Sequence, residues 1–145
     1  MRNPGSPGDS GRVLRCLIVD DNPRFVAAAR LLLERQGAQV VGVATTGDEA
    51  IQRIRELRPD VTLLDINLGA ESGFQVARRI HRQADQATSP VILISSHAEQ
   101  DYADLIAASP SLGFLAKSDL SASAVRDLLE GRGGGQGDVT EPPGR

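Results

Sequence analysis

The chain has 145 residues, 40% of them hydrophobic and 3% aromatic, with a formal net charge of −3. That length fits one domain with an aliphatic core, and the acidic balance argues against nucleic-acid binding through a basic surface. The single cysteine excludes an internal disulfide, and no apolar stretch has the length of a membrane span or the form of a signal sequence. We therefore expect a soluble, cytoplasmic protein that by itself binds neither nucleic acid nor a membrane.

The two ends of the chain differ from its middle. Residues 1–12 and 131–145 are rich in Gly, Pro and Arg and have no hydrophobic period, which predicts disordered tails, the second being a free tail or a truncated linker. Residues 13–130 form the predicted domain. Apolar runs alternate there with segments of helical period and without a hairpin signal, so we expect an α/β fold: a doubly wound, parallel five-stranded sheet with helices on both faces.

The predicted strands are the short apolar runs, and the predicted helices lie between them. The strands are expected at about residues 15–19, 40–44, 61–65, 91–95 and 114–116. A long loop is expected to run to about residue 72, and the fourth helix to cover about residues 100–108. The helix positions expected to face the core follow helical spacing. They are Phe25, Ala29, Leu32 and Leu33, then Ala50, Ile51, Ile54 and Leu57, then Phe74, Ala77 and Ile80, then Tyr102, Leu105 and Ile106, then Val125, Leu128 and Leu129.

Two of the helix starts carry capping residues. Asn22 or Asp21 can cap the first helix, and Gly37 stops it. Thr46, with Glu49 three residues later, predicts a capping box at the second helix. The connections after the first two strands should therefore lead directly into helices.

Polar and charged residues stand where four of the apolar runs end. Lysine occurs once among 16 basic residues, at such an end, which suggests that a compact ammonium group is needed there. Open α/β sheets bind ligands outside the carboxyl ends of their strands, so we expect these residues to meet in one pocket. They are Asp20 and Asp21, Asp65, Ser95 and Ser96, and Lys117.

The acidic residues have both an ordinary and a chemical interpretation. Alone, Asp65 is a strand-end residue that turns the chain; beside a cation and a lysine it is a carboxylate nucleophile for a phosphoryl group. Asp20 and Asp21 could cap a helix, yet two adjacent acids at the end of a buried strand cost energy without a cation. Oxygen ligands favour Mg²⁺ (or Mn²⁺), and the backbone carbonyl of Asn67 would complete the set with the three carboxylates.

Two serines compete for the hydroxyl position of this pocket. Strand alternation points Ser95 and Ser96 to opposite sides, and we favour Ser95 because it directly follows the apolar run. Alone, Ser95 is an ordinary strand-end hydroxyl and Lys117 an ordinary surface lysine. The order and expected convergence of all these residues predict a phosphoryl-transfer site.

The same residues resemble the receiver domain of bacterial two-component response regulators, within the CheY-like superfamily. The resemblance spans about residues 14–130 and implies a flavodoxin-like (βα)5 fold. Its motifs are LIVDDN at 17–22, LLDINL at 63–68, Gly73, VILISS at 91–96 and GFLAK at 113–117.

The resemblance implies a role for each site residue. Asp65 would accept a phosphoryl group from the phosphohistidine of a histidine kinase or phosphotransfer protein, with Mg²⁺ bound by the acidic residues, and Ser95 and Lys117 would contact that group. Phe114 matches the family's aromatic switch position, although by spacing it is equally a core residue. His97 occupies a position whose residue influences autodephosphorylation in the family. By itself it is equally a solvated loop residue. The chain would catalyse only its own phosphorylation and dephosphorylation, and would otherwise not be an enzyme.

Two positions depart from the family pattern. Gly69 follows Leu68 where Met-Pro is frequent, which should make the loop after the acceptor more flexible. Ser118 follows Lys117 in place of a frequent proline whose peptide bond is often cis. A cis bond before a residue other than proline costs about 2.5–4 kcal/mol, so the sequence leaves the isomer of this bond open.

The resemblance also implies partners. Phosphorylation would shift the surface around the fourth helix, fifth strand and fifth helix, which would control an unidentified output partner or support a phosphorylation-dependent homodimer. The sequence contains no second domain, which predicts a stand-alone receiver or a piece of a longer regulator. The alternatives are a receiver-like interaction module that is not phosphorylated and, least favoured, a phosphatase with an aspartyl nucleophile.

Overall fold

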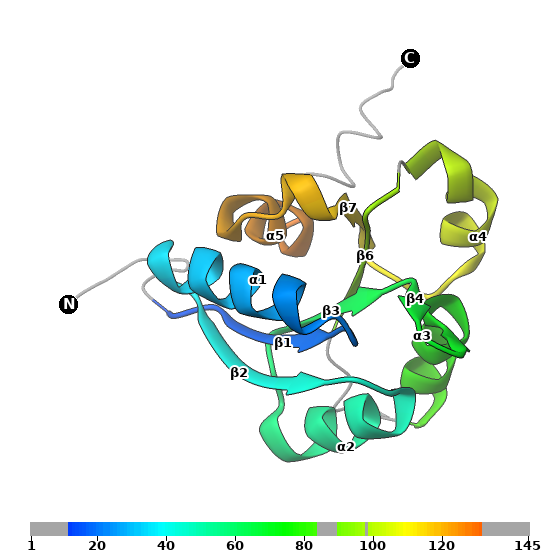
Figure 1. The fold of residues 1–145 in the computed structure, drawn as a ribbon, viewed down its shortest axis with the longest axis horizontal. Coiled ribbons are helices and arrows are strands. Elements are labelled where there is room, and N and C mark those ends of the chain that lie inside the picture. Colours follow the sequence, from blue (N-terminus) through cyan, green and yellow to red (C-terminus); the bar gives the residue numbers. More distant parts are fainter. Residues whose placement is uncertain (1–11, 84–89, 98, 132–145) are drawn as a thin grey trace.

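A parallel five-stranded sheet forms the centre of the computed structural model, which describes residues 12–83, 90–97 and 99–131 (Figure 1). Its strand order is β2-β1-β3-β6-β7, so the fold is the predicted doubly wound, flavodoxin-like arrangement. The predicted tails lie outside the described residues, apart from Arg12 and Gly131. The strands are β1 (Arg15–Val19), β2 (Gln39–Ala44), β3 (Val61–Asp65), β6 (Val91–Ser95) and β7 (Gly113–Ala116).

Among the described residues, five α-helices cover the two faces of this sheet. Apolar side chains of α1 and α5 pack on one face, and those of α2 and α3 on the other, where α4 also packs (Figure 1). Within the described part of the chain, no helix has the length and apolar character needed to cross a membrane. The helices are α1 (Pro23–Arg35), α2 (Gly47–Leu57), α3 (Gly73–Gln83), α4 (Ala103–Ala108) and α5 (Ala122–Leu129).

The two central strands explain why both faces need cover. Every residue of β3 and β6 is buried, as expected for parallel strands between two helical layers. Successive side chains alternate between the layers. Leu64 and Leu93 join the core beneath α2 and α3, whereas Leu63 and Ile92 join the core beneath α1 and α5.

The helix caps fix where the chain leaves the sheet. The side chain of Asn22 caps α1 by accepting hydrogen bonds from the backbone N–H groups of Arg24 and Phe25, at 3.0 and 3.3 Å. Of the two candidates, Asn22 rather than Asp21 is therefore the cap. The helix ends at Arg35, and Gly37 follows with a φ of 90°, a left-handed conformation that suits glycine.

The capping box of α2 forms in an altered arrangement. Thr46 Oγ1 accepts from the backbone N–H of Glu49 at 3.2 Å, as predicted. The Glu49 carboxylate, however, binds the backbone N–H of Thr45 at 2.8 Å, one residue before the cap. Both bonds fix the turn between β2 and α2.

A short hairpin replaces the long loop predicted after β3. Its strands, β4 (Asn67–Leu68) and β5 (Glu71–Ser72), pair antiparallel around Gly69 and Ala70. Gly69 allows this turn through its positive φ of 60°. The prediction of a long loop was therefore wrong here, because each strand of this hairpin is only two residues long and gives no alternating pattern.

The fourth helix also differs from the prediction. A 3₁₀ turn (Glu99–Tyr102) precedes α4, so regular helix begins at Ala103 rather than near residue 100. Leu105 was expected to face the core but is 48% exposed, and Leu32 of α1 is 36% exposed. On α1, Val26 packs against the core in addition to Phe25. Both leucines fit a helical period but lie at the margin of the buried stripe.

Cys16 in β1 gives a test of core integrity. Its side chain is fully buried, and burial, reinforced by the nearby Asp60 charge, raises the pKa of its thiol to about 12. An unfolded cysteine titrates near 8.5. Above about pH 8.5 the unfolded chain loses the thiol proton while the folded chain keeps it, which favours unfolding. The folded protein therefore becomes less stable as the pH rises from about 8.5 toward 12.

We expect iodoacetamide at pH 9 to label Cys16 slowly in the native protein and rapidly in urea, because only the unfolded chain offers thiolate. Alkylation followed by mass spectrometry measures both rates. Equal rates in the two states would contradict the buried position.

Candidate functional site

Three carboxylates meet at the carboxyl edge of the sheet. Asp20 and Asp21 directly follow β1, and Asp65 ends β3, the neighbouring strand. One carboxylate oxygen from each lies within 4.8 Å of the other two. Asp20 and Asp65 are buried and Asp21 is exposed, so the cluster opens to solvent on the Asp21 side.

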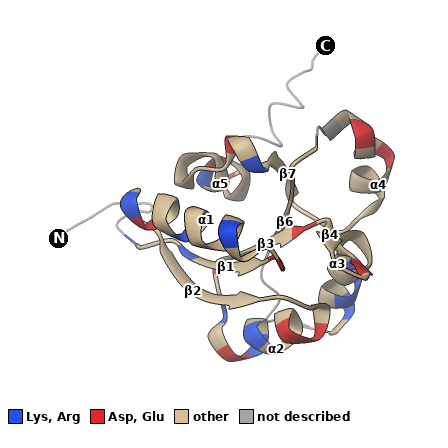
Figure 2. Ribbon diagram, viewed as in Figure 1, with Lys and Arg blue, Asp and Glu red and all other residues tan. Residues whose placement is uncertain are grey.

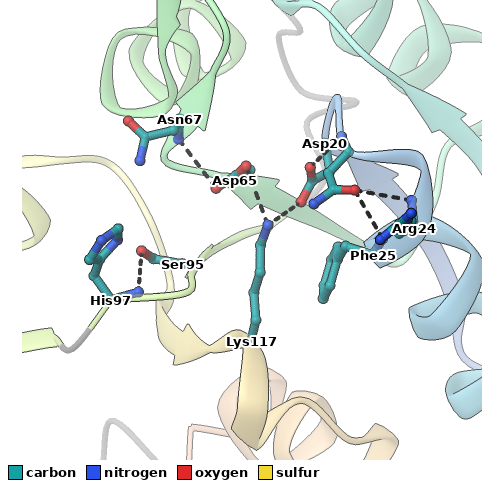
Figure 3. A network of polar contacts seen from close by, with 9 residues as sticks. Asp20, Arg24, Phe25, Asp65, Asn67, Ser95, His97 and Lys117 are labelled. Atoms are coloured by element: carbon teal, nitrogen blue, oxygen red, sulfur yellow. Dashed lines mark hydrogen bonds and ion pairs between the residues drawn. The ribbon is translucent and has the colours of Figure 1, made fainter.

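The only lysine of the chain reaches this cluster from the edge strand of the sheet. Lys117 follows β7, and its Nζ lies 2.7 Å from Asp20 Oδ2 and 3.5 Å from Asp65 Oδ2 (Figure 3). The ammonium also lies over the ring of Phe25, 4.3 Å from the ring centroid. The structure thus brings together the acid pair, the lone acid and the lysine that the sequence singled out.

Asp20 is held firmly through one of its oxygens. Asp20 Oδ1 accepts a hydrogen bond from the backbone N–H of Asn22 at 2.9 Å. Asp20 Oδ2 is buried, and Lys117 Nζ lies 2.7 Å from it as an ion pair. Three carboxylate oxygens this close together form a donor set that fits a hard divalent cation.

Asp65 is oriented by the hairpin that follows it. Its Oδ1 accepts from the backbone N–H of Asn67 at 3.2 Å, while Oδ2 faces Lys117. Burial raises the pKa of the Asp65 carboxyl, and the Asp20 charge adds to this, whereas the Asn67 amide and the Lys117 ammonium lower it. Additional positive charge at the cluster would favour the ionised, nucleophilic form of Asp65.

Ser95 and Ser96 at the end of β6 differ as strand alternation predicts. Ser95 is 1% exposed, and its hydroxyl accepts a hydrogen bond from the backbone N–H of His97 at 2.9 Å, whereas Ser96 is exposed. In Figure 3 Ser95 and Asp20 lie on opposite sides of the Lys117 ammonium. The His97 ring contacts Tyr102 edge to face, with centroids 6.2 Å apart.

The remaining predicted residues lie around this pocket. Phe114 in β7 is half-buried and packs against the core beneath α2 and α3. Gly69 sits over the acidic cluster, because a Cβ built there would be 3.1 Å from Asp21 Oδ2. The peptide bond between Lys117 and Ser118, which the sequence left open, is trans.

Sequence reasoning missed three contributors to this geometry. Phe25 was assigned only to the apolar face of the first helix, although its ring also lies beneath the lysine ammonium. Asn22 was considered only as a cap, yet its backbone N–H also holds Asp20. Glu71 was placed in a loop, but its side chain joins that loop to α2. The contact of each residue joins elements that are distant in the sequence or uses a backbone group. Residue type and spacing therefore do not predict these contacts.

The fold and the site together define a doubly wound α/β domain with an acidic cluster and a lysine at the carboxyl edge of its sheet. A sequence model described as "Response regulator receiver domain" matches residues 16–128. The chain belongs to the response regulator receiver domain family.

Known proteins that resemble the chain agree with this assignment. The DNA-binding transcriptional activator EvgA of Escherichia coli K12 is 27% identical over 106 residues, which are 73% of this chain and 51% of EvgA. The chain spans about half the length of such curated relatives. The receiver domain of the response regulator NarL from Mycobacterium tuberculosis has a TM-score of 0.73 at 30% identity, covering 84% of this chain and 100% of that domain.

A third relative was solved with a metal ion. It is the receiver domain of sensor histidine kinase PA1611 from Pseudomonas aeruginosa PAO1, with a magnesium ion coordinated in its active-site cleft. It has a TM-score of 0.68 at 24% identity and covers 84% of this chain and 99% of that domain. At this identity the likeness shows the fold.

Proposed function

We propose that the chain is a phosphoacceptor switch in which Asp65 takes a phosphoryl group from the phosphohistidine of a histidine kinase or phosphotransfer protein. The observation that carries this proposal is the position of Lys117, whose ammonium lies between the buried carboxylates of Asp20 and Asp65. Such a charge beside a carboxylate nucleophile lowers the repulsion that an incoming phosphoryl group meets.

The transfer consists of one displacement at phosphorus. An oxygen of ionised Asp65 forms a P–O bond while the P–N bond of the phosphohistidine breaks. The departing imidazole nitrogen keeps the electron pair of that bond. The product is an acyl phosphate on Asp65, and water later cleaves it to inorganic phosphate. In this proposal the chain catalyses only these two reactions on itself.

The acidic cluster supplies the ligands for a cation in this chemistry. Asp20, Asp21 and Asp65 would hold Mg²⁺ or Mn²⁺, together with the backbone carbonyl of Asn67. When bound, the cation neutralises charge on the phosphoryl oxygens. The approach of the three carboxylates to within 4.8 Å of one another supports this assignment. The magnesium in the PA1611 receiver domain agrees with it.

The new phosphoryl group would change the contacts of three nearby residues, Ser95, Phe114 and His97. The Ser95 hydroxyl, which in this structure accepts from the His97 amide, would donate to a phosphoryl oxygen. Phe114, only half-buried, would turn further into the space that Ser95 vacates. The surface of α4, β7 and α5 would then shift between two packings. His97, next to the hydroxyl, would modulate water access and hence phosphate loss.

The partners follow from this switch. The shifted surface would bind an output partner or a second copy of the chain. EvgA is a DNA-binding activator about twice as long as the match, so this chain corresponds to the receiver part of such regulators, residues 13–130 in our proposal. A cytoplasmic location would suit exchange with a kinase. The chain itself would not contact nucleic acid.

Mass spectrometry after incubation with acetyl phosphate and Mg²⁺ tests the proposal. We expect the wild type to gain one phosphoryl mass on Asp65 and Asp65→Asn to gain none. Beryllium fluoride with Mg²⁺, a mimic of the acyl phosphate, should shift the amide resonances around Ser95 and Phe114. A wild type that takes neither group would point to the alternative, an interaction module that works without phosphate.

A further inference from the structure

The hairpin that follows Asp65 is tied to the start of α2 by one side chain. Glu71 Oε1 accepts a hydrogen bond from the backbone N–H of Gly47 at 2.8 Å. Gly47 is the first residue of α2, so its N–H has no partner within the helix. Building on the phosphoacceptor function, we propose that Glu71 is a positioning residue of the aspartyl site, because it fixes the hairpin whose Asn67 amide holds Asp65.

Arg79 of α3 contacts both Glu71 and the first turn of α2. Arg79 Nη1 lies 3.6 Å from Glu71 Oε2, and Arg79 Nη2 lies 2.5 Å from Asp48 Oδ1 in the first turn of α2. Figure 2 shows charged residues of both signs along α2 and basic residues on α3. The Glu71 and Arg79 side chains are 35% and 29% exposed, so solvent screens their attraction and their main effect is geometric.

The packing at Gly47 shows how closely this cluster lies against the α2 backbone. A Cβ built on Gly47 would be 2.9 Å from Arg79 Nη1 and 3.0 Å from Glu71 Oε2. Both atoms are the ends of flexible side chains, so a side chain at position 47 would push the Glu71 carboxylate and the Arg79 guanidinium away from the helix start. The absence of a side chain at position 47 therefore lets the Glu71 carboxylate reach the helix start.

The path from Glu71 to the acceptor is short. In the hairpin Glu71 pairs with Leu68, the residue next to Asn67. The base of the hairpin is closed by a hydrogen bond from Gly73 N–H to the Ile66 carbonyl at 2.8 Å. The bond from Asn67 N–H to Asp65 Oδ1 is 3.2 Å, at the long end of the range, so a small movement of the hairpin would break it.

Glu49 provides a matched control at the same helix end. Its carboxylate also serves the start of α2, but its hydrogen bonds go to the backbone and hydroxyl of Thr45, within the connection between β2 and α2. Removal of either glutamate side chain costs α2 a capping interaction. Only removal of Glu71 also breaks the bond that ties the hairpin to α2.

The test compares Glu71→Ala, Glu71→Gln and Glu49→Ala in the full chain. The initial rate of acyl phosphate formation is measured by mass spectrometry with acetyl phosphate and Mg²⁺. The hydrogen exchange rate of the Asn67 backbone amide is measured by NMR. Loss of positioning in Glu71→Ala should slow phosphorylation about tenfold and speed Asn67 exchange. Glu71→Gln keeps an oxygen acceptor and should stay near wild type, as should Glu49→Ala.

Equal phosphorylation rates in Glu71→Ala and Glu49→Ala, with equal Asn67 exchange, would overturn the role of Glu71. If the wild type takes no phosphoryl group, the proposed function fails, and Asn67 exchange alone decides the positioning role. If Glu71→Ala does not fold, Glu71→Asp, one methylene shorter, replaces it, and it is expected to slow phosphorylation where Glu71→Gln does not.

Discussion

Replacing Lys117 with methionine is expected to lower the free energy of unfolding of the metal-free protein by about 3 kcal/mol. The side chain is 16% exposed and its ammonium lies 2.7 Å from Asp20, which has no exposed surface. The variant would leave a buried carboxylate without its counter-charge, and such a group is costly in an apolar environment. Urea denaturation followed by circular dichroism measures the loss.

Magnesium and a second substitution separate this cause from lost packing. Mg²⁺ should restore more stability to Lys117→Met than to the wild type, because a cation at the acidic cluster replaces the missing charge. Adding Asp20→Asn should recover part of the loss. Arg12→Met, which breaks an exposed ion pair with Asp60, serves as the control and should cost less than about 1 kcal/mol. If Lys117→Met and Arg12→Met lose the same stability, the Lys117 ammonium does not compensate the buried charge of Asp20.

Replacing Gly73 with alanine is expected to destabilise the fold by about 3 kcal/mol and to displace the end of β3 at Asp65, the proposed acceptor. A Cβ at this position would lie 2.2 Å from the backbone carbonyl oxygen of Asp65 and 2.5 Å from Ile66 Cα. Backbone atoms cannot swing aside as side chains do, so α3 and the end of β3 would have to separate. Phosphorylation of Asp65 should fall along with stability.

Gly113→Ala is the matched control for this steric effect. Its Cβ would meet Leu128, but the nearest atom, at 3.0 Å, is the flexible end of that side chain. Neither glycine has a positive φ, so backbone strain does not distinguish them. Thermal unfolding should show a clearly smaller loss for Gly113→Ala. A loss as large as that of Gly73→Ala would mean that the contact with Asp65 is not the cause.

The parallel sheet was predictable because the signals of its elements agree. The runs that became β1, β3 and β6 are continuous and apolar, and the segments between them carry helical spacing with caps or stop signals. With the strand order β2-β1-β3-β6-β7, right-handed crossovers place helices on both faces, but they do not fix that order by themselves. The convergence of Asp20, Asp65 and Lys117 could be expected for the same reason, since all three stand at carboxyl ends of parallel strands.

The elements predicted less well are those that depend on tertiary contacts. The hairpin of β4 and β5 is too short for a periodic signal and is held by pairing with itself and by the bond from Glu71 to α2. The start of α4 lacks a capping side-chain bond, so a 3₁₀ turn could replace its first residues. Leu105 shows that helical spacing indicates a face without giving its depth of burial.

Asn22 couples the start of α1 to the orientation of the buried Asp20 carboxylate. Its side chain starts α1, and its backbone N–H steadies Asp20. Substitutions that move the backbone of the first turn of α1 would thus also move the N–H group that Asp20 Oδ1 accepts from. Substitutions aimed at thermostability are better made toward Arg35, at the opposite end of that helix.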